Sequence, residues 1–189
     1  MGTLRPGGLA LALGGLVWAT VVRLAATPVP VMALWEGRPQ RGRPSVAIVL
    51  QDGATVALAY RHSVWGVVVA EWLEATREGW RLVGVEGPTP DIEAYYHIPG
   101  ARMTRVGERY RLDVDTPVEM PLITVQATEV GDRTLVVGAR CLPLSRIGRT
   151  VTIGRLRVPL GQWVRTVDRA DRMPWGRCPP DMRWVARSA

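Results

Sequence analysis

The stretch Thr150-Val-Thr-Ile-Gly-Arg-Leu-Arg-Val158 separates each apolar side chain from the next by Thr, Gly or Arg. Successive side chains of a β-strand point to opposite faces, so this pattern predicts a strand with one dry and one wet face. Arg109-Tyr-Arg-Leu-Asp-Val114 has the same pattern. No segment shows an apolar period of 3.6 residues over three turns, so the folded part is expected to be built from strands.

Short apolar runs separated by turn residues continue through most of the chain. The runs are Val46–Leu50, Thr55–Tyr60, Val64–Trp72, Trp80–Val85, Arg109–Val114, Leu122–Thr128, Thr134–Ala139, Thr150–Val158 and Gln162–Val167. Strands at such spacing are typical of all-β domains. We therefore predict a mainly β fold, a compact antiparallel sandwich or barrel of about 7–10 short strands, preceded by one N-terminal hydrophobic helix.

Three turn signals predict hairpins. Asp52-Gly53 joins the first two runs, and Asp-Gly is a strong tight-turn signal. Arg77-Glu78-Gly79 joins the third and fourth runs, and Gly131-Asp132 separates two later ones. Each signal predicts that the runs on either side of it pair with each other.

The N-terminal segment carries Arg5 and then an apolar run from Leu9 to Val22. A cleaved signal peptide is one interpretation, with a cut near Ala25, Ala26 or Ala33. An uncleaved anchor over residues 7–27 is the favoured one, because no clean Ala-x-Ala site is present. A buried first helix of a soluble protein would need a polar face, which residues 7–22 lack.

The chain divides into four parts on composition. Residues 1–35 are expected to be the signal peptide or membrane anchor. Residues 36–44 have no apolar side chain beyond proline and are interpreted as a linker. Residues 45–167 are the predicted β domain, and residues 168–189 form a basic tail rich in Arg, Pro and Trp that either packs on the domain or stays loose.

The charge is positive but dispersed. The chain has 24 basic and 17 acidic residues, a net charge of +7, and all of the basic residues are Arg. Nucleic-acid binders concentrate such charge on one face or helix, so no nucleic-acid partner is expected. No P-loop, Gly-x-Gly-x-x-Gly, EF-hand or His-Glu-x-x-His motif occurs, so no cofactor and no nucleotide chemistry are predicted.

The charges beside the apolar run bear on its orientation. Arg38, Arg41 and Arg43 follow it, whereas Arg5 precedes it. Counting basic residues near the run would place the folded domain in the cytoplasm, where these arginines could bind anionic lipid. This cytoplasm-facing, lipid-binding domain is one of the alternatives that the sequence leaves open.

The two cysteines, Cys141 and Cys178, allow one pairing. A disulfide is permitted if the domain lies outside the cytoplasm. The spacing does not show whether the two residues meet, so two unrelated small apolar side chains remain the alternative. No Cys-x-x-Cys motif indicates a zinc or redox site.

The most distinctive local string is Tyr60-Arg-His-Ser-Val64, followed by Glu71-Trp72. The chain resembles the domain of unknown function family 1850 in Tyr60, His62, Ser63 and Val64 and in the later Glu71-Trp72 pair. That resemblance covers residues 44–145. The chain departs from the family in Trp65-Gly66-Val67-Val68 and in the segment from residue 92 to residue 100.

The resemblance implies a context rather than a chemistry. Members of that family are small extracytoplasmic domains often encoded beside TAXI-type TRAP transporters. It implies a domain on the cell surface or in the periplasm, with a membrane, and a transporter or its solute-binding protein, as partners. The predicted function is an uncharacterised, membrane-anchored accessory domain without a catalytic role.

His62 beside Ser63 raises the question of a nucleophile and its base. Neighbours on a strand point to opposite faces, so these two side chains cannot pair. A triad would need Ser63 to meet His97, and no Gly-x-Ser-x-Gly elbow is present. The favoured interpretation is a structural His62 bonded to a backbone carbonyl or to a carboxylate such as Glu71.

A small-ligand or metal-binding module around His62, Glu71 and His97 is the other alternative. Imidazole and carboxylate are common metal ligands, but zinc sites usually contain closer local ligand pairs. The Trp and Tyr residues that crowd this part of the chain could line a ligand pocket. Core packing is favoured for them, because the chain has no Phe to fill that volume.

Overall fold

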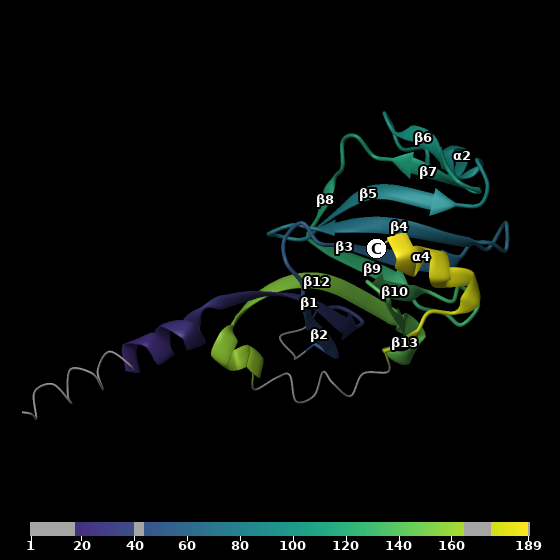
Figure 1. Cartoon of the computed structure of the whole chain (residues 1–189). Helices are drawn as coiled ribbons and strands as arrows, with labels where there is room; N and C mark the ends of the chain where they lie inside the picture. The colour runs from purple at the N-terminus through teal and green to yellow at the C-terminus, as the bar shows by residue number, and fades with distance from the viewer. Residues whose placement is uncertain (1–17, 40–43, 165–174, 189) are drawn as a thin grey trace, which may run out of the picture.

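The computed structural model describes residues 18–39, 44–164 and 175–188. Within them, thirteen strands form two antiparallel sheets (Figure 1). The predicted mainly β, antiparallel class is confirmed. Neither sheet closes into a barrel. The strand number exceeds the expected range because five strands were not among the predicted runs. They are β1 (Pro28–Glu36), β6 (Arg102–Val106), β8 (Glu119–Met120), β11 (Arg140–Pro143) and β13 (Gly176–Arg177), of which β8 and β13 have only two residues each.

The small sheet has four strands in the order β2-β1-β12-β9. Its strands are β1 (Pro28–Glu36), β2 (Val46–Val49), β9 (Leu122–Gln126) and β12 (Thr150–Pro159). The alternating stretch that predicted a strand is therefore β12, which pairs with the whole of β1, from Val151 opposite Glu36 to Pro159 opposite Pro28.

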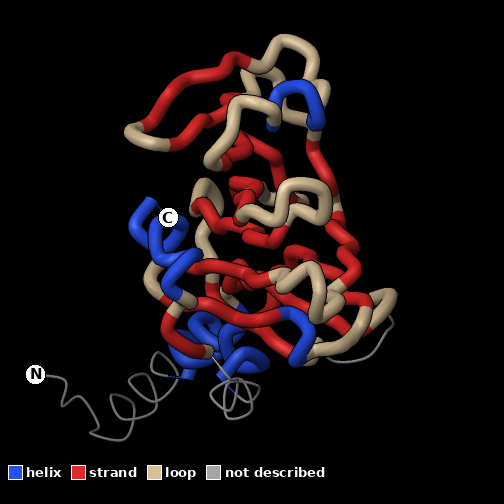
Figure 2. Tube along the Cα trace, turned by 90° about the vertical axis from the view of Figure 1, so that its right-hand side faces the viewer, coloured by secondary structure: helices blue, strands red, loops and turns tan. Residues whose placement is uncertain are grey.

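The large sheet has nine strands in the order β13-β11-β10-β3-β4-β5-β7-β6, with β8 also paired to β5. Its remaining strands are β3 (Thr55–Arg61), β4 (Val68–Ala75), β5 (Trp80–Gly87), β6 (Arg102–Val106), β7 (Arg109–Asp113), β10 (Thr134–Val137) and β11 (Arg140–Pro143). A short helix, α2 (Ile92–Tyr96), lies at the far end from the small sheet (Figures 1 and 2).

The main core fills the space between the two sheets. Met32 and Leu34 of β1, Leu58 of β3 and Ile153 of β12 are completely buried in one cluster. Residues of the same parity on each strand supply this cluster, as the pleat requires. The two sheets are thus held face to face by apolar burial.

The other face of the large sheet is covered by the C-terminal segment. After β13, the chain forms the 3-10 turn η2 (Pro180–Met182) and helix α4 (Arg183–Ser188), which lies over the sheet in Figure 1. Met182 and Val185 pack against small side chains of β3 and against Trp72 of β4. The described part of the predicted tail, residues 175–188, therefore packs on the domain.

One of the three predicted hairpins is confirmed. Strands β4 and β5 pair across residues 77–79. The hairpin predicted at Asp52-Gly53 is wrong, because β2 pairs with β1 in the small sheet and β3 pairs with β4 and β10 in the large one. The hairpin predicted at Gly131-Asp132 is wrong for the same reason, because β9 and β10 lie in different sheets.

The start of the β domain lies earlier than residue 45. Residues 28–35, expected to belong to the leader, and Glu36, expected to begin the linker, form β1 between β2 and β12. Gly37 and Arg38 of the expected linker therefore lead from β1 towards β2 within one sheet, and residues 40–43 lie outside the described residues. The apolar side chains of residues 31–35 belong to the folded domain, not to a membrane segment.

Residues 18–26 are helical and lead away from β1 (Figure 1). Among the described residues, no helix has the length and apolarity needed to cross a membrane. The expected anchor over residues 7–27 and the apolar run from Leu9 fall largely outside the described part of the chain.

The strand expected at Gln162–Val167 is wrong in its described part. Residues 160–164 are helical, and residues 165–167 lie outside the described chain. The Leu160 N–H donates to the Thr27 carbonyl over 2.9 Å, and Gly161 packs near Ala25. The end of β12 is thus joined to the end of the N-terminal helix.

Candidate functional site

The distinctive string occupies the loop between β3 and β4. The His62 N–H donates to the Val67 carbonyl, and the Gly66 N–H donates to the His62 carbonyl, each over 2.8 Å. Gly66 has φ of +65°, a backbone region that glycine enters without steric cost. The string therefore forms a tight loop at the end of a strand, and only its first residues continue β3.

His62 is buried under aromatic rings, with 2% of its surface exposed. Trp65 stacks on the imidazole at 4.0 Å between ring centroids, and Tyr95 meets it edge-on at 4.3 Å. The Val64 N–H donates to Nδ1 over 3.3 Å, which assigns the proton of the neutral ring to Nε2. Burial lowers the pKa of His62, so its neutral form is favoured.

Tyr60, Tyr96 and Glu71 form a chain of hydrogen bonds on the side of the sheet that faces α2. The Tyr96 hydroxyl donates to Glu71 Oε1 over 2.8 Å, and the Tyr60 hydroxyl donates to Tyr96. Burial, with the nearby Glu71 charge, raises the pKa of Tyr60 to about 12 and raises the pKa of Tyr96 further. Both phenols therefore remain protonated donors over the physiological range, and the Arg133 guanidinium lies 4.6 Å from the Tyr60 ring centre.

The expected partners of His62 are not the observed ones. Glu71 accepts from Tyr96, and no hydrogen bond joins it to His62 within the described structure. Ser63 is exposed and His62 is buried, but both follow the end of β3, so the strand alternation on which the expectation rested does not apply to them. Val64, expected to share a face with His62, is 74% exposed because the strand has already ended.

His97 lies at the end of α2, exposed, with φ of +46°. Its Nδ1 is 3.4 Å from the carbonyl oxygen of Tyr95. Across residues 18–39, 44–164 and 175–188, no three His, Cys, Asp or Glu side chains are grouped closely enough to hold a metal ion. The structure thus does not assemble His62, Glu71 and His97 into a metal centre.

Trp72, the second residue of the Glu71-Trp72 pair, points to the opposite face of β4. It is 1% exposed and packs with Met182 and Val185 of the C-terminal segment. The alternation along a strand explains the pair, because Glu71 serves the polar chain on one face while Trp72 fills the core of the other.

A pocket of about 320 Å³ lies behind the loop, between the large sheet and the C-terminal segment. Its apolar walls come from Val67, Val68, Pro88 and Trp184, and its charged groups are Arg61, Arg109 and Asp181. None of these charged residues stands out in the sequence. Arginine is too frequent in this chain for any one of them to stand out.

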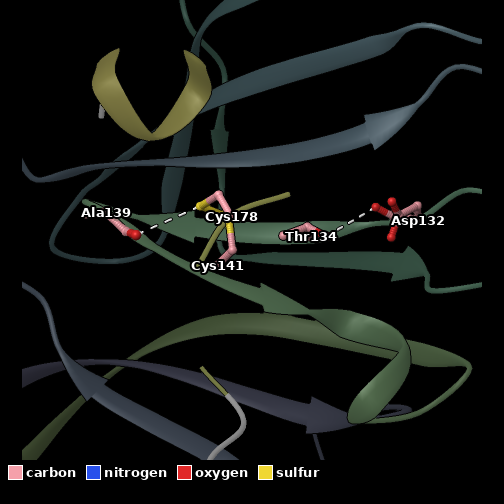
Figure 3. Close-up of a disulfide and its surroundings, with 5 residues drawn as sticks. All are labelled: Asp132, Thr134, Ala139, Cys141 and Cys178. Atoms are coloured by element: carbon pink, nitrogen blue, oxygen red, sulfur yellow. Dashed lines mark hydrogen bonds between the residues drawn. A yellow bond between two sulfur atoms is a disulfide. The ribbon is translucent and has the colours of Figure 1, made fainter. Parts of the chain in front are cut away.

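A disulfide between Cys141 and Cys178 fastens the C-terminal segment to β11 (Figure 3). Their Cα atoms are 5.0 Å apart and the residues are 37 positions apart in the chain. Figure 3 also shows Thr134 of β10, whose hydroxyl donates to the Asp132 carbonyl over 3.3 Å. The disulfide therefore fixes the start of the C-terminal segment to the edge of the large sheet that it covers.

No protein-family model, curated protein or solved structure matches the chain. The resemblance to the domain of unknown function family 1850 consequently rests on the loop string and the Glu71-Trp72 pair alone.

Proposed function

We propose that the chain is a membrane-tethered accessory domain on the extracytoplasmic side. The observation that carries this proposal is the helix of residues 18–26, on which Trp18, Val21, Val22 and Leu24 are each about half exposed or more. Exposed apolar side chains on a helix are costly in water and favourable in a bilayer. The helix continues an apolar run that begins at Leu9.

The Cys141–Cys178 disulfide supports the extracytoplasmic side. Disulfides persist in oxidising compartments and are rare where thiols are kept reduced. The arginines that follow the apolar run argue against an extracytoplasmic domain, and Arg38 among them is exposed. The disulfide carries more weight here, because such bonds are rare where thiols are kept reduced, whereas only a few arginines follow the apolar run.

An accessory role without catalysis fits the geometry of the loop. His62 is stacked and buried, burial lowers its pKa, and Glu71 accepts a hydrogen bond from Tyr96. A general base has to reach its substrate through a hydrogen bond or one water molecule, which this burial disfavours. The resemblance suggests the partner: a TAXI-type TRAP transport system or its solute-binding protein.

Protease protection tests the proposal. The full chain with a C-terminal tag is expressed in a diderm bacterium, and protease is added to spheroplasts and then to lysed cells. We expect the tag to sediment with membranes and to be lost already in intact spheroplasts. A cytoplasmic-loop reporter serves as the protected control.

Two results would count against the proposal. Protection of the tag in intact spheroplasts would instead support the cytoplasm-facing, lipid-binding alternative that involves Arg38, Arg41 and Arg43. Recovery of the full-length chain in the soluble fraction would show that the chain is not tethered to the membrane. Copurification of a transporter subunit with the tagged chain tests the partner. The control is a tagged Trp18→Ser/Leu24→Ser variant that has lost its membrane attachment.

A further inference from the structure

The pocket between the large sheet and the C-terminal segment contains two arginines held in fixed orientations. Arg109 Nε donates to Glu86 Oε1 over 2.7 Å, and Glu86 is 2% exposed. The Arg109 guanidinium carbon lies 4.3 Å from the ring centre of Trp184. A buried carboxylate and an aromatic face thus position this cation before any ligand arrives.

Arg61 faces the same pocket from the end of β3. One of its terminal nitrogens donates to the Gly66 carbonyl over 2.8 Å, and the other donates to Asp181 Oδ2 over 2.6 Å. The carbonyl belongs to the tight loop, so the loop fixes the guanidinium against the pocket wall.

We propose that this pocket binds a small molecule with one carboxylate group and an apolar body. The side chains that line it carry two guanidinium groups and one carboxylate, and the other walls are apolar. Guanidinium groups form paired hydrogen bonds to carboxylates, and apolar walls favour an apolar body. The volume falls within the range of about 300–1,000 Å³ that is usual for small-molecule sites.

The Arg61–Asp181 ion pair is the contact that a ligand carboxylate would replace. The two side chains are 42% and 43% exposed, and ion pairs this exposed contribute little to stability. Asp132 lies nearby, where burial and the Asp181 charge raise its pKa, so Asp181 already has an unfavourable neighbour. Exchange of Asp181 for a ligand carboxylate on Arg61 therefore costs little.

The C-terminal segment gives the pocket a stable outer wall. Cys178 ties its start to β11, and Met182 and Val185 bury its middle against the large sheet. Trp184 and Asp181, which face the pocket, are thereby held in place. A preformed wall lowers the entropy cost of binding.

Calorimetric titration of the full chain with three matched compounds tests the ligand class. The probes are 3-phenylpropionate, 3-phenylpropanol and 3-phenylpropylamine, which share one apolar body and differ in the charge of the head group. We expect saturable binding of the carboxylate, with the alcohol and the amine about ten-fold weaker or weaker still. Equal binding of the alcohol, or no binding of the carboxylate, would overturn the proposal.

Two variants change the affinity in opposite directions. Arg61→Gln removes one partner of the carboxylate and should weaken 3-phenylpropionate binding about ten-fold. Asp181→Asn removes the competing carboxylate and should strengthen it about three-fold or more. Arg102→Gln is the matched control, since it breaks the exposed Arg102–Asp115 pair and leaves the pocket intact.

Circular dichroism of each variant confirms that it folds before it is titrated. If Arg61→Gln does not fold, Asp181→Asn decides the question alone. Unchanged or weaker binding in Asp181→Asn, or an equal loss in Arg102→Gln, would show that the arginines of the pocket do not hold the carboxylate.

Discussion

Glu71 sets the properties of the two phenols beside it. Its carboxylate accepts a hydrogen bond from Tyr96, and the Tyr96 hydroxyl accepts one from Tyr60, so the three residues form one hydrogen-bond network. Removing one member of such a network leaves the others partly unsatisfied, at a cost of about 1–3 kcal/mol. This hydrogen-bond network ties β3 and β4 to α2, which explains why a five-residue helix is held in place at the end of the sheet.

The dependence of stability on alkaline pH tests the hydrogen-bond network at Tyr60. The unfolded phenol loses its proton near pH 10, whereas the folded one keeps it to about 12. The contribution to the free energy of unfolding is therefore complete below pH 10 and is lost as pH rises through about 12. Urea unfolding between pH 9 and 11.5 should show this decline.

The Tyr60→Phe variant should reduce both the decline and the tyrosinate absorbance change near pH 12. Tyr110→Phe, on β7, is the control for removing one phenol elsewhere. A decline of unchanged size in Tyr60→Phe would show that another group causes it.

The loop string shows how far sequence reasoning reaches at the residue scale. The predicted motif group was Tyr60, His62, Ser63, Val64, Glu71 and Trp72. Of these, Tyr60 and Glu71 are joined through Tyr96, whereas Trp72 packs on the opposite face of β4. Sequence reasoning did not identify Tyr96 as the partner of Glu71, because α2 is separated from β4 by an intervening strand and only folding brings them together. A residue's partner depends on the packing of distant elements, which local spacing does not contain.

At the scale of elements, turn chemistry predicted a change of direction but not its destination. Asp52-Gly53 and Gly131-Asp132 do turn the chain, and Gly53 and Asp132 have positive φ. Both turns carry the chain from the small sheet to the large one, whereas residues 77–79 join strands of one sheet. The choice depends on which apolar faces can be buried together, since a turn constrains only the residues within it.

The disulfide determines how firmly the C-terminal segment stays on the large sheet. It closes a loop between Cys141 and Cys178 that limits the unfolded chain, so its loss should lower the free energy of unfolding by about 2–5 kcal/mol. Urea unfolding with and without dithiothreitol measures this difference.

The Cys141→Ala/Cys178→Ala variant provides the control for reductant. Its unfolding midpoint should match that of the reduced chain and should not respond to dithiothreitol. A response of the double variant would place the effect of the reductant elsewhere than on this bond.

At the scale of the whole molecule, β1 holds the small sheet together. It lies between β2 and β12, and it buries Met32, Leu34 and Trp35. Each large apolar side chain buried in this way contributes about 1.5–3 kcal/mol. Several such side chains together approach the whole stability of a domain, about 5–15 kcal/mol.

Two truncated chains test the position of the domain boundary. A chain from residue 27 to residue 189 should fold, whereas one from residue 45 to residue 189 should not, because it lacks β1. Dispersion of amide signals in proton–nitrogen NMR spectra separates the two outcomes. Well-dispersed spectra from both chains would show that β1 is dispensable. The same reasoning excludes a signal-peptide cut after Ala33 in a protein that folds, because it would remove most of β1.

The sequence by itself determined that this protein is mainly β and antiparallel, where most strands lie, and that β4 and β5 form a hairpin. These properties follow from alternation and from short-range turns, which are written in neighbouring residues. Only the tertiary structure decided that residues 28–36 belong to the domain, that two predicted hairpins cross between sheets, and that residues 175–188 pack on one face of the large sheet. The pocket with Arg61 and Arg109 was likewise decided there, because its walls come from strands and a terminal segment that are distant along the chain and meet only when apolar faces are buried together.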